Sequence, residues 1–541
     1  MTIGEKIIGL RSAARISQEQ LAEKLSVSRQ SVSKWEMDQA LPQMDKILQL
    51  AELFGVTTDE LLRDHMTIRR LAVETDGTGE RKTRYFGTDG FRGEANVDVT
   101  AEQAFRIGRY LGWHFSVCGI REAGSRPKIV IGKDTRRSSY MLEYAIAAGL
   151  TASGADAYML HVTTTPSVSY VTRNEDFDCG IMISASHNPY CDNGIKLVNS
   201  YGEKMDDKLL LRIEDYLDAD YTALGLKGDI PLATGEKIGR IIDHVAGRNR
   251  YIGYLISIAA HSYRNVRVGL DCANGASWMI AQSVFNALGA SVTVIHADPD
   301  GTNINRDAGS THIEALQRCV RENHLDIGFA FDGDADRCIA VDENGNEING
   351  DHILYILAKR LKAKDSLDHN TVVMTVMSNT GLGLALDREG IRYIRTTVGD
   401  RYVYEAMLKH QYKLGGEQSG HIILQKYATT GDGILTALMI MEEMMDRKFP
   451  LSKLAEPMKM LPQVLHNVHV ASKAAVTGDP EVKKLCASID EKLKGRGRLL
   501  LRESGTEPVI RIMVECEDET ECEAYAAQVE ALIRERGLSD D

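Results

Sequence analysis

A serine in a polar turn and a distant aspartate-rich loop are the residues best suited to chemistry. Residues 184–189 read Ser-Ala-Ser-His-Asn-Pro, and Asp332, which begins the sequence Asp-Gly-Asp-Ala-Asp-Arg, follows Ser186 by 146 positions. A phosphorylated serine carries about −1.5 to −2 charges and three strong acceptor oxygens, so a divalent cation held by carboxylates would stabilise it. The pair therefore predicts phosphoryl transfer.

The aspartate loop lies between two apolar runs in DIGFAFDGDADRCIAVD, residues 326–342. Alternate positions allow Asp332, Asp334 and Asp336 to converge on one hard cation, for which Mg²⁺ is the best candidate. An EF-hand is the competing interpretation, because Glu343 falls at the twelfth position of such a loop. It fails, since Arg337 occupies the sixth position, where glycine is needed, and the flanks are strand-like.

Ser186 follows the apolar run 179–183 and precedes His187-Asn188-Pro189. We expect it on a turn at the end of a strand, exposed to substrate. The alternative is that Ser186 and its neighbours only make the hydrogen bonds of the turn.

Two later loops could bind a phosphorylated sugar. Glu417 and Ser419 follow Gly415-Gly416 and offer groups for sugar hydroxyls, although a polar surface turn would look the same. The segment 502–508, Arg-Glu-Ser-Gly-Thr-Glu-Pro, is followed by Arg511 and has the parts of a dianion cradle. An ordinary turn with solvated arginines is the alternative.

The elements that must position these loops alternate between strands and helices. The apolar run 128–132 precedes a helical pattern at 140–153, and the run 266–271 precedes one at 278–288. This alternation predicts α/β units with mixed, mainly parallel sheets. The stretch after Pro462 reads as a smaller α+β domain.

Residues 1–66 read as a separate set of short helices, with 18–25 and 29–36 at helix-turn-helix spacing. The segment SQEQLAEKLSVSRQSVSKWE resembles the Cro/C1-type (XRE) family, and LAELFGVTTDELL extends the resemblance. That family places the start of the second motif helix in the major groove. The residues so implied in DNA binding are Arg29, Gln30, Ser31 and Lys34. We expect Leu21, Ala22, Leu25, Val32 and Trp35 to face inward.

The charge of this segment leaves an alternative open. Residues 1–66 hold 8 Lys plus Arg against 10 Asp plus Glu, a net charge of −2, whereas strong DNA binders are usually basic. A vestigial or protein-binding helical module therefore competes with DNA binding. Residues 67–83 are polar, include two glycines and read as a linker.

The bulk composition sets wide limits. The chain has 541 residues, 43% hydrophobic and 26% charged, with a net charge of −13, and should divide into several domains. We expect no membrane span and a cytoplasmic protein, because no long apolar run or secretory signal is present. Nine scattered cysteines without a C-x-x-C pair argue against a disulfide framework and a zinc site, and we expect most to be buried.

Six motifs in order resemble the α-D-phosphohexomutase superfamily. They are FGTDGFRG (86–93), GKDTRRSS (132–139), ISASHNPYCDNGIK (183–196), DGDADR, GEQSGH and RESGTEPVIR. The wording of ISASHNP, GEQSGH and TTGDG (429–433) is similar to the phosphoglucosamine mutase branch. The resemblance covers residues 84 to about 535.

The resemblance implies three mixed α/β domains and a C-terminal α+β domain around one cleft, preceded by the all-α module. The expected limits are 84–236 for the phosphoserine domain, 237–345 for the metal loop, 346–457 for the sugar loop and 458–541 for the phosphate loop.

Roles for single residues follow from the resemblance. Ser186 is the expected phosphoserine, and Asp332, Asp334 and Asp336 bind Mg²⁺ together with its phosphate. Arg92, His187 and Lys196 line the reacting centre, Arg337 flanks the metal loop, and Arg136 helps to neutralise charge. Sugar and phosphate binding fall to Glu417, Ser419, Arg502, Ser504, Gly505, Thr506 and Arg511.

The implied reaction interconverts glucosamine 6-phosphate and glucosamine 1-phosphate, on the route to UDP-N-acetylglucosamine. It uses Mg²⁺, phosphorylated Ser186 and a glucosamine 1,6-bisphosphate intermediate, and either Lys196 or His187 takes the proton of the attacking hydroxyl. The expected partners are sugar phosphates, and DNA for residues 1–66; a homodimer is a possible assembly. Two other functions stay open: a transcriptional regulator that senses sugar phosphates, and a mutase for mannose or glucose phosphates.

Two departures from the family wording bear on substrate preference. Asn349-Gly350-Asp351 stands where Asp-Gly-Asp is usual, and SNTGL at 378–382 varies a motif often written SNLGL. The fused N-terminal module is the largest departure.

Overall fold

A computed structural model describes residues 3–13, 16, 18–36, 40–54, 58, 83–118, 125–503 and 509–540. The chain forms two compact units, residues 1–82 and 83–541, and each is described by itself. The predicted linker, 67–83, lies almost entirely outside the described residues.

The N-terminal unit is all-helical in its described part. It contains α1 (Ile3–Ala13), α2 (Gln18–Lys24), α3 (Arg29–Glu36) and α4 (Met44–Phe54). The Ser28 hydroxyl accepts a hydrogen bond from the Ser31 amide at 3.2 Å, which caps the start of α3. The helix-turn-helix prediction is confirmed, with α2 ending one residue earlier than expected. The five residues predicted to face inward, Leu21, Ala22, Leu25, Val32 and Trp35, are all buried.

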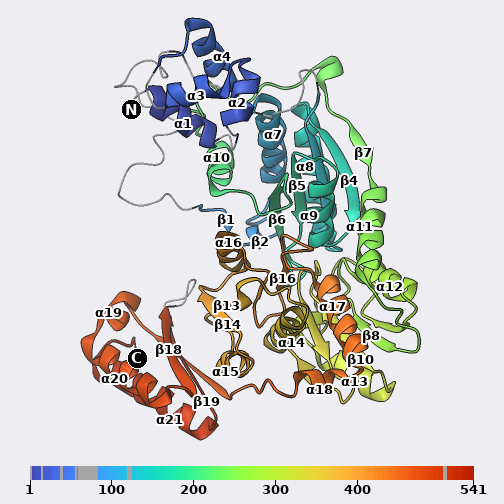
Figure 1. Cartoon of the computed structure of the whole chain (residues 1–541), viewed down its shortest axis with the longest axis vertical. Helices are drawn as coiled ribbons and strands as arrows, with labels where there is room; N and C mark the ends of the chain where they lie inside the picture. The colour runs from blue at the N-terminus through green and yellow to red at the C-terminus, as the bar shows by residue number, and fades with distance from the viewer. Residues whose placement is uncertain are drawn as a thin grey trace. The chain divides into compact units, whose positions relative to one another are not determined.

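The second unit begins with a seven-stranded mixed sheet in the order β1-β2-β6-β5-β3-β4-β7 (Figure 1). Its strands are β1 (Phe86–Gly87), β2 (Gly90–Glu94), β3 (Lys128–Lys133), β4 (Asp156–Val162), β5 (Cys179–Ile183), β6 (Asp192–Asn199) and β7 (Ile241–Asp243). The accompanying helices are α7 (Ala101–Cys118), α8 (Arg137–Ala152), α9 (Thr165–Asn174) and α10 (Asp207–Leu217). Strands β3, β4, β5 and β7 are parallel, whereas β1, β2 and β6 pair in antiparallel fashion.

A five-stranded sheet follows, in the order β12-β11-β10-β8-β9. Its strands are β8 (Arg267–Asp271), β9 (Ser291–Ile295), β10 (Ile327–Phe331), β11 (Cys338–Val341) and β12 (Glu347–Ile348). The helices are α11 (Val245–Ile258), α12 (Trp278–Ala287) and α13 (Glu314–Glu322). The aspartate loop connects the antiparallel pair β10 and β11, so the strand flanks that argued against an EF-hand are present.

The third sheet has the order β14-β13-β15-β16. Its strands are β13 (Thr371–Thr375), β14 (Arg392–Thr396), β15 (Leu414–Gly416) and β16 (Ile422–Leu424). Around it lie α14 (Gly350–Ala363), α15 (Thr380–Arg388), α16 (Asp400–His410), α17 (Gly433–Arg447) and α18 (Leu451–Ala455). The turn between β15 and β16 carries Glu417 and Ser419.

The last sheet is antiparallel, in the order β17-β19-β18. Its strands are β17 (Gln463–His469), β18 (Gly497–Glu503) and β19 (Val509–Cys516), and its helices are α19 (Lys473–Gly478), α20 (Pro480–Leu493) and α21 (Glu519–Glu535). The expectation of three mixed α/β units and a C-terminal α+β domain is confirmed. Short 3₁₀ turns complete the described structure at Gly235–Lys237, Gly309–Thr311 and Asp368–Asn370.

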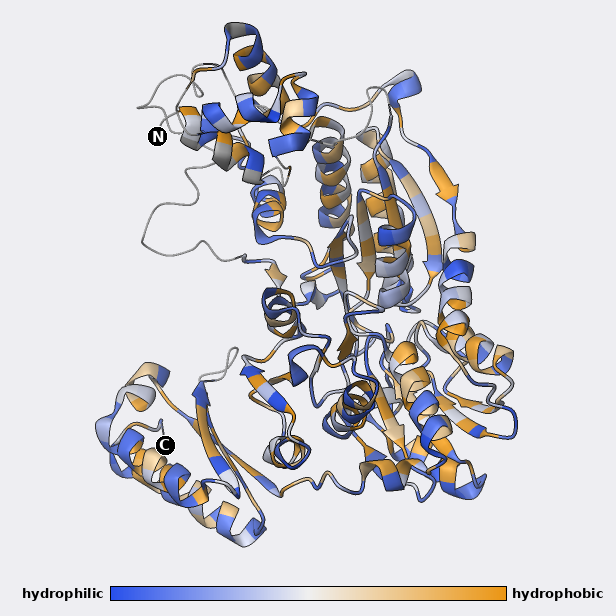
Figure 2. Cartoon of the chain, viewed as in Figure 1, coloured by the Kyte–Doolittle hydropathy of each residue, from blue (hydrophilic) through white to orange (hydrophobic). Residues whose placement is uncertain are grey.

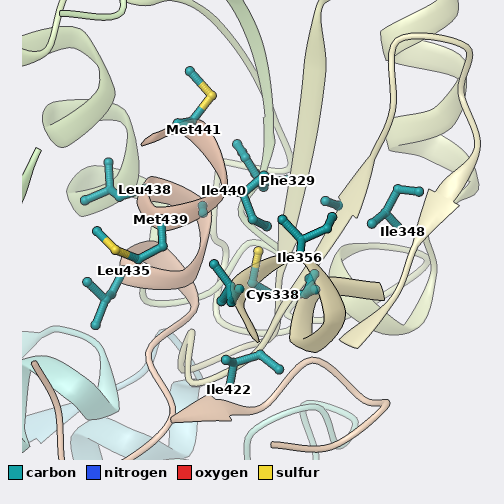
Figure 3. Close-up of a cluster of buried hydrophobic side chains, with 14 of the residues drawn as sticks. Phe329, Cys338, Ile348, Ile356, Ile422, Leu435, Leu438, Met439, Ile440 and Met441 are labelled. Carbon is teal, nitrogen blue, oxygen red and sulfur yellow. The ribbon is translucent and has the colours of Figure 1, made fainter. Parts of the chain in front are cut away.

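One buried cluster joins the second and third sheets into a single core. Helix α17 is the common element, because its apolar side chains pack with residues of both sheets (Figure 3). The labelled members include Phe329 of β10, Ile422 of β16 and Leu438 of α17. Burial of such side chains contributes about 1.5–3 kcal/mol each. The loops after β10 and β15 therefore rest on one shared core.

The hydropathy pattern explains the layers. The strands of the large sheet are mostly apolar, while α20 and α21 mix apolar and polar residues as half-buried helices do (Figure 2).

Residues Ile241–Asp243, which the sequence assigned to the second α/β domain, pair with β4 and extend the first sheet. The exact domain limits stay predictions.

Two expectations from composition can be compared with the described residues. No described helix combines the length and apolar character needed to cross a bilayer. Of the cysteines the structure describes as free, six are buried: Cys179, Cys272, Cys319, Cys338, Cys516 and Cys522. Burial of most cysteines is thus confirmed.

Candidate active site

Ser186 lies in the turn after β5 and meets the aspartate loop directly. Its Oγ donates a hydrogen bond to Asp332 Oδ2 at 2.5 Å, and His187 Nδ1 is 3.4 Å away. The backbone of Ser186 has a φ of 52°, an uncommon conformation for a residue with a Cβ. Such strain persists where the surroundings hold it and is frequent at functional sites.

The expectation that Ser186 is exposed is wrong for this structure, because only 1% of the residue is accessible. The β10–β11 loop covers it, a contact between different sheets that no local pattern reveals. The placement at the end of a strand, however, is as predicted.

Two polar side chains hold the serine turn through its backbone. Arg136 donates to the carbonyls of Ser186 at 3.2 Å and Asn188 at 2.6 Å, and Asn305 donates to the same carbonyls at 2.8 and 3.0 Å. Arg136 is fully buried and also pairs with Asp134. Through these contacts Arg136 positions the serine turn. All of them are made to the protein itself.

Gly333 allows the two loops to approach. A Cβ at this position would lie 2.5 Å from the carbonyl oxygen of Ser186. The glycine between the first two aspartates is therefore a steric requirement of the site.

The three aspartates form a buried cluster. Ligand oxygens of Asp332, Asp334 and Asp336 lie within 4.8 Å of one another, and none of the residues is more than 5% exposed. Burial raises the pKa of Asp332, and the charges of Asp336 and Asp334 add to the effect. Three acidic groups so close together and so dry require positive charge.

The free oxygens of the cluster fit a cation. Asp334 Oδ1 and Asp336 Oδ1 are buried and have no hydrogen-bond partner. Buried carboxylate oxygens are costly when unpaired, and oxygen donors are those that Mg²⁺ prefers. The residues present thus suit a hard divalent cation beside Ser186 Oγ.

Lys196 supplies part of the positive charge. Its Nζ lies 2.6 Å from Asp334 Oδ2 and 3.3 Å from Asp336 Oδ2. Burial acts to lower the pKa of Lys196, but the two carboxylates outweigh it and the pKa is raised. His187 shows the opposite behaviour, since burial and the charges of Arg337 and Arg92 lower its pKa to about 4. In this state Lys196 is a cation and His187 is neutral.

Arg92 and Arg337 border this centre. Arg92 is on β2 and pairs with Asp89 at 3.1 Å. The backbone N–H of Arg337 donates to Asp332 Oδ1 at 3.1 Å. Burial acts to lower the pKa of Arg337, but Asp332 and Asp336 raise it. The structure brings together Ser186, His187, Lys196, Arg92, Arg337 and the three aspartates, the residues that the resemblance placed at the reacting centre.

The β15–β16 turn contributes a buried acid and an exposed hydroxyl. Glu417 is buried, and its Oε1 accepts a hydrogen bond from the Gly399 amide at 3.0 Å. Ser419 is exposed on the same turn.

His421, two residues further on, is a neighbour of the site to which sequence reasoning assigned no role. Its ring nitrogens lie 3.7 Å from Asp336 Oδ2 and 3.5 Å from Asp400 Oδ2. Burial opposes protonation, but Asp400 and Asp336 raise the pKa to about 9. Its place in GEQSGH was the available signal. Lys204 is a second neighbour of the site, and it bridges Asp400 at 2.6 Å and Asp89 at 3.1 Å. The local sequence around Lys204 carries no signal that could have identified it.

The C-terminal sheet presents two arginines side by side. Arg502 of β18 and Arg511 of β19 are directly opposite in the antiparallel register. Burial and the charge of Arg511 lower the pKa of Arg502. Two like charges held together suit a dianion. Ser504, Gly505 and Thr506 lie outside the described residues.

On the N-terminal unit, α3 carries the residues predicted to contact DNA. Arg29, Gln30 and Lys34 are exposed, whereas Ser31 is half-buried and its Oγ lies 2.9 Å from Ser28 Oγ. Three of the four side chains are thus free to reach a partner.

The two departures from the family wording are structural positions near the third sheet. Asn349 caps α14, and its side chain accepts from the amides of Asp351 and His352. Asn379 of SNTGL caps α15. Neither residue is among those gathered around Ser186.

Comparison with known proteins agrees with this geometry. Four segments match the phosphoglucomutase/phosphomannomutase alpha/beta/alpha domains I, II and III and C-terminal domain, at residues 83–223, 249–345, 349–461 and 465–532. Residues 10–61 match a helix-turn-helix family.

Relatives and solved structures extend the likeness along the chain. The phosphoglucosamine mutase of Lachnospira eligens is 59% identical over 84% of this chain and 99% of its own. A phosphoglucomutase/phosphomannomutase family protein of Burkholderia thailandensis has a TM-score of 0.67 at 21% identity, over 84% of this chain and 98% of that one.

The Aspergillus fumigatus N-acetylphosphoglucosamine mutase, in complex with GlcNAc-6P and magnesium, has a TM-score of 0.60 at 17% identity, over 87% and 99% of the two chains. At such identities these two structures support the fold alone. The high identity to the Lachnospira eligens protein over nearly its whole length decides the family: from residue 83 onward, this chain belongs to the phosphoglucosamine mutases.

Proposed function

We propose that the unit of residues 83–541 interconverts glucosamine 6-phosphate and glucosamine 1-phosphate through phosphorylated Ser186. The observation that carries this proposal is the Ser186 hydroxyl, 2.5 Å from Asp332 and beside two further buried carboxylates with free oxygens. Membership of the phosphoglucosamine mutase family supports the choice of sugar.

In the first half-reaction, phospho-Ser186 gives its phosphoryl group to the free hydroxyl of the bound sugar phosphate. The bond between phosphorus and Ser186 Oγ breaks, a bond to the sugar oxygen forms, and the proton of the sugar hydroxyl passes by way of the proton acceptor to Ser186 Oγ. The product is glucosamine 1,6-bisphosphate. The bisphosphate then reorients in the site so that its other phosphoryl group faces Ser186. That group is transferred to Ser186 by the reverse of the same steps.

The side chains around Ser186 divide the work. His187 is the candidate proton acceptor, because it is neutral in this state and its Nδ1 lies 3.4 Å from Ser186 Oγ, where the sugar hydroxyl must attack the phosphorus. Lys196 is engaged by two carboxylates and serves as a fixed positive charge. Arg92 and Arg337 neutralise the phosphoryl oxygens. Positioning and charge neutralisation dominate phosphoryl transfer in general.

Asp332, Asp334 and Asp336 would hold Mg²⁺ together with the phosphate of Ser186. A bound divalent cation supplies charge stabilisation at the phosphoryl oxygens. The buried oxygens of Asp334 and Asp336 that have no hydrogen-bond partner support this assignment.

The other end of the substrate would be held by the last two loops. Glu417 and Ser419 orient sugar hydroxyls, and Arg502 with Arg511 grips the phosphate that does not react, assisted by Ser504, Gly505 and Thr506. The paired arginines of β18 and β19 support this part of the proposal.

The test combines intact-protein mass spectrometry with an isomerisation assay primed by the bisphosphate. The parent should carry one phosphoryl group, and Ser186→Ala should lose both that mass and turnover. Ser257→Ala, which removes an exposed hydroxyl on α11, is the matched control and should retain both. A Ser186→Ala protein that isomerises glucosamine phosphates at the parental rate would disprove the phosphoserine route.

Substrate choice is tested with glucosamine, glucose and mannose phosphates side by side. We expect kcat/KM to be highest for glucosamine phosphate. A higher value for mannose or glucose phosphate would reassign the enzyme within the wider family. If no sugar phosphate turned over but one bound and altered DNA affinity, the protein would be a sensor.

We further propose that α3 binds DNA. The exposed Arg29, Gln30 and Lys34 on a helix-turn-helix support this, despite the acidic charge of the module. Binding of the full chain to promoter fragments should weaken steeply between low and physiological salt. Absence of binding to any fragment at low salt would remove DNA as a partner.

A further inference from the structure

A cavity of about 490 Å³ is lined by residues of α8, β4, α11 and α12 and of the loops before α8 and after β9. None of the residues predicted for the catalytic site lines it. Its volume falls within the range of roughly 300–1,000 Å³ found for small-molecule sites. Its principal lining residues are Arg137, Tyr140, His161, Arg248, Trp278 and Asp300.

The charges around this cavity favour an anion. Arg137 and Arg248 form no ion pair with any other residue that the structure describes. Arg248 only donates to the Val162 carbonyl at 3.2 Å, and burial lowers its pKa from the ordinary value. The carboxylate of Asp300 already accepts hydrogen bonds from the amide and hydroxyl of Thr302, at 2.7 and 2.8 Å. Asp243, next to the lining, lies 3.6 Å from His161 and counters part of the charge of Arg248. The lining itself holds two arginines against one carboxylate, Asp300, so its net charge is positive.

Two helices begin at the cavity. Helix α8 begins at Arg137 and α12 begins at Trp278, and both residues line the cavity. The side chains at the N-cap positions, Arg136 and Ser277, make no capping hydrogen bond. At the start of α8 the Arg137 amide already donates to the Gly301 carbonyl at 3.0 Å, and the buried Asp134 carboxylate accepts from the Arg136 amide at 2.9 Å. The start of α12 is therefore the helix end that adds its positive dipole to the two arginines.

Aromatic side chains line the same space. Trp278 is half-buried, and Tyr140 is 45% exposed. Lys133 Nζ lies 4.0 Å from the centre of the Tyr140 ring, so its charge orients this ring from within the protein. Aromatic faces beside cationic groups provide a stacking surface for a planar ring attached to phosphate.

We propose that this cavity binds a nucleoside diphosphate, with its phosphates at Arg137 and Arg248 and its base against Trp278 or Tyr140. The proposal does not depend on the mutase reaction. The cavity is nevertheless connected to the serine turn through neighbouring residues of the chain. Thr135 and Arg137 line the cavity, and Arg136 between them holds the carbonyl of Ser186.

The experiment titrates UDP and ADP separately into the full chain and follows heat by calorimetry and tryptophan fluorescence. We expect saturable binding, with an affinity about tenfold lower in Arg137→Ala and in Arg248→Gln. Arg318→Ala removes an exposed arginine of α13 outside the cavity and should leave affinity unchanged. Trp278→Phe should diminish the fluorescence response more than the heat.

Several outcomes would overturn the proposal. Absence of heat with both nucleotides, or unchanged affinity in Arg137→Ala and Arg248→Gln, would refute the site. Competition by glucosamine 6-phosphate would place the nucleotide in the catalytic site. Inorganic pyrophosphate is the probe without a base, and affinity equal to that of UDP would refute the nucleoside. Parental melting temperatures and isomerisation rates in the variants, which alter no proposed catalytic residue, would confirm that they are folded.

Discussion

The mutase unit and the helix-turn-helix unit place their charged residues in opposite ways. Around Ser186, the acidic triad and Lys196 are almost completely buried. On α3, Arg29 and Lys34 are exposed above an apolar core that includes Trp35. Phosphoryl transfer needs fixed charges in a dry site, where they are strong. Recognition of a large anion needs charges that can reach a surface.

Buried and exposed charges make different demands on the surrounding structure. Buried charges must be paired, as Lys196 is with Asp334 and Asp336. The side chains of Arg136 and Asn305 also hold the turn by donating to the Ser186 carbonyl. Exposed charges require only a stable helix beneath them. The comparison predicts that changes beneath α3 affect folding of that unit alone, whereas a single added methyl group near Ser186 affects chemistry.

The largest expected effect is on the small unit. Trp35→Ala should remove about 3–5 kcal/mol of its folding free energy, because the side chain is buried in the apolar core. Limited proteolysis should then cut residues 1–66 rapidly while isomerisation stays at the parental rate. Leu41→Ala, at a residue 73% exposed, is the control and should change neither. Loss of isomerisation in Trp35→Ala would show that the two units depend on each other.

Gly333→Ala should be the most damaging small change in the mutase unit. The new methyl group would meet the Ser186 carbonyl at 2.5 Å and displace the serine turn. Misplacement by about 1 Å can cost about 10²-fold in rate, and kcat should fall accordingly. Gly478→Ala adds the same group where nothing lies within 4 Å and should be silent. Equal activity of both variants would mean that the loops need no close contact.

Arg29→Ala and Lys34→Ala should weaken DNA binding about tenfold at low salt without changing isomerisation. Each lost phosphate contact should reduce the slope of log affinity against log salt by about 1. Lys24→Ala removes an exposed cation from α2 and is the matched control. Unchanged salt slopes in both α3 variants would exclude this helix as the DNA-contacting face.

Asp351 offers a smaller test of the cost of buried charge. Burial raises its pKa to about 7, although the Asn379 amide donates to it at 2.8 Å. A raised pKa in the folded state means that this residue's contribution to stability is greatest in acid and is lost as the pH rises toward 7. The difference in free energy of unfolding between Asp351→Asn and the parent should therefore be more favourable to the variant at pH 8 than at pH 5, by about 1 kcal/mol or more.

Melting temperatures measured across this pH range provide the readout, and each kcal/mol corresponds to a shift of about 2–4 °C for domains of 150–250 residues. A constant difference between Asp351→Asn and the parent at all pH values would contradict the assignment.

Much of the fold was predictable because its signals are local. The apolar run before Ser186, the alternating aspartates and the periodicity of residues 18–36 identify a strand end, a carboxylate loop and a helix pair. The burial of Ser186 and the support from Asn305 were not predictable in this way. They arise where loops of different sheets meet, 119 positions apart in the second case.

The sequence by itself determined which groups could react, since residue type and spacing decide the chemistry that a loop can offer. It also determined the order of strands and helices through hydrophobic periodicity. Only the tertiary structure decided that Ser186 lies against Asp332, that Lys196 is held as a cation, and that His421 stands between two acids. The physical reason is that distance and desolvation, which set the charge of each group, depend on packing between segments far apart in the chain.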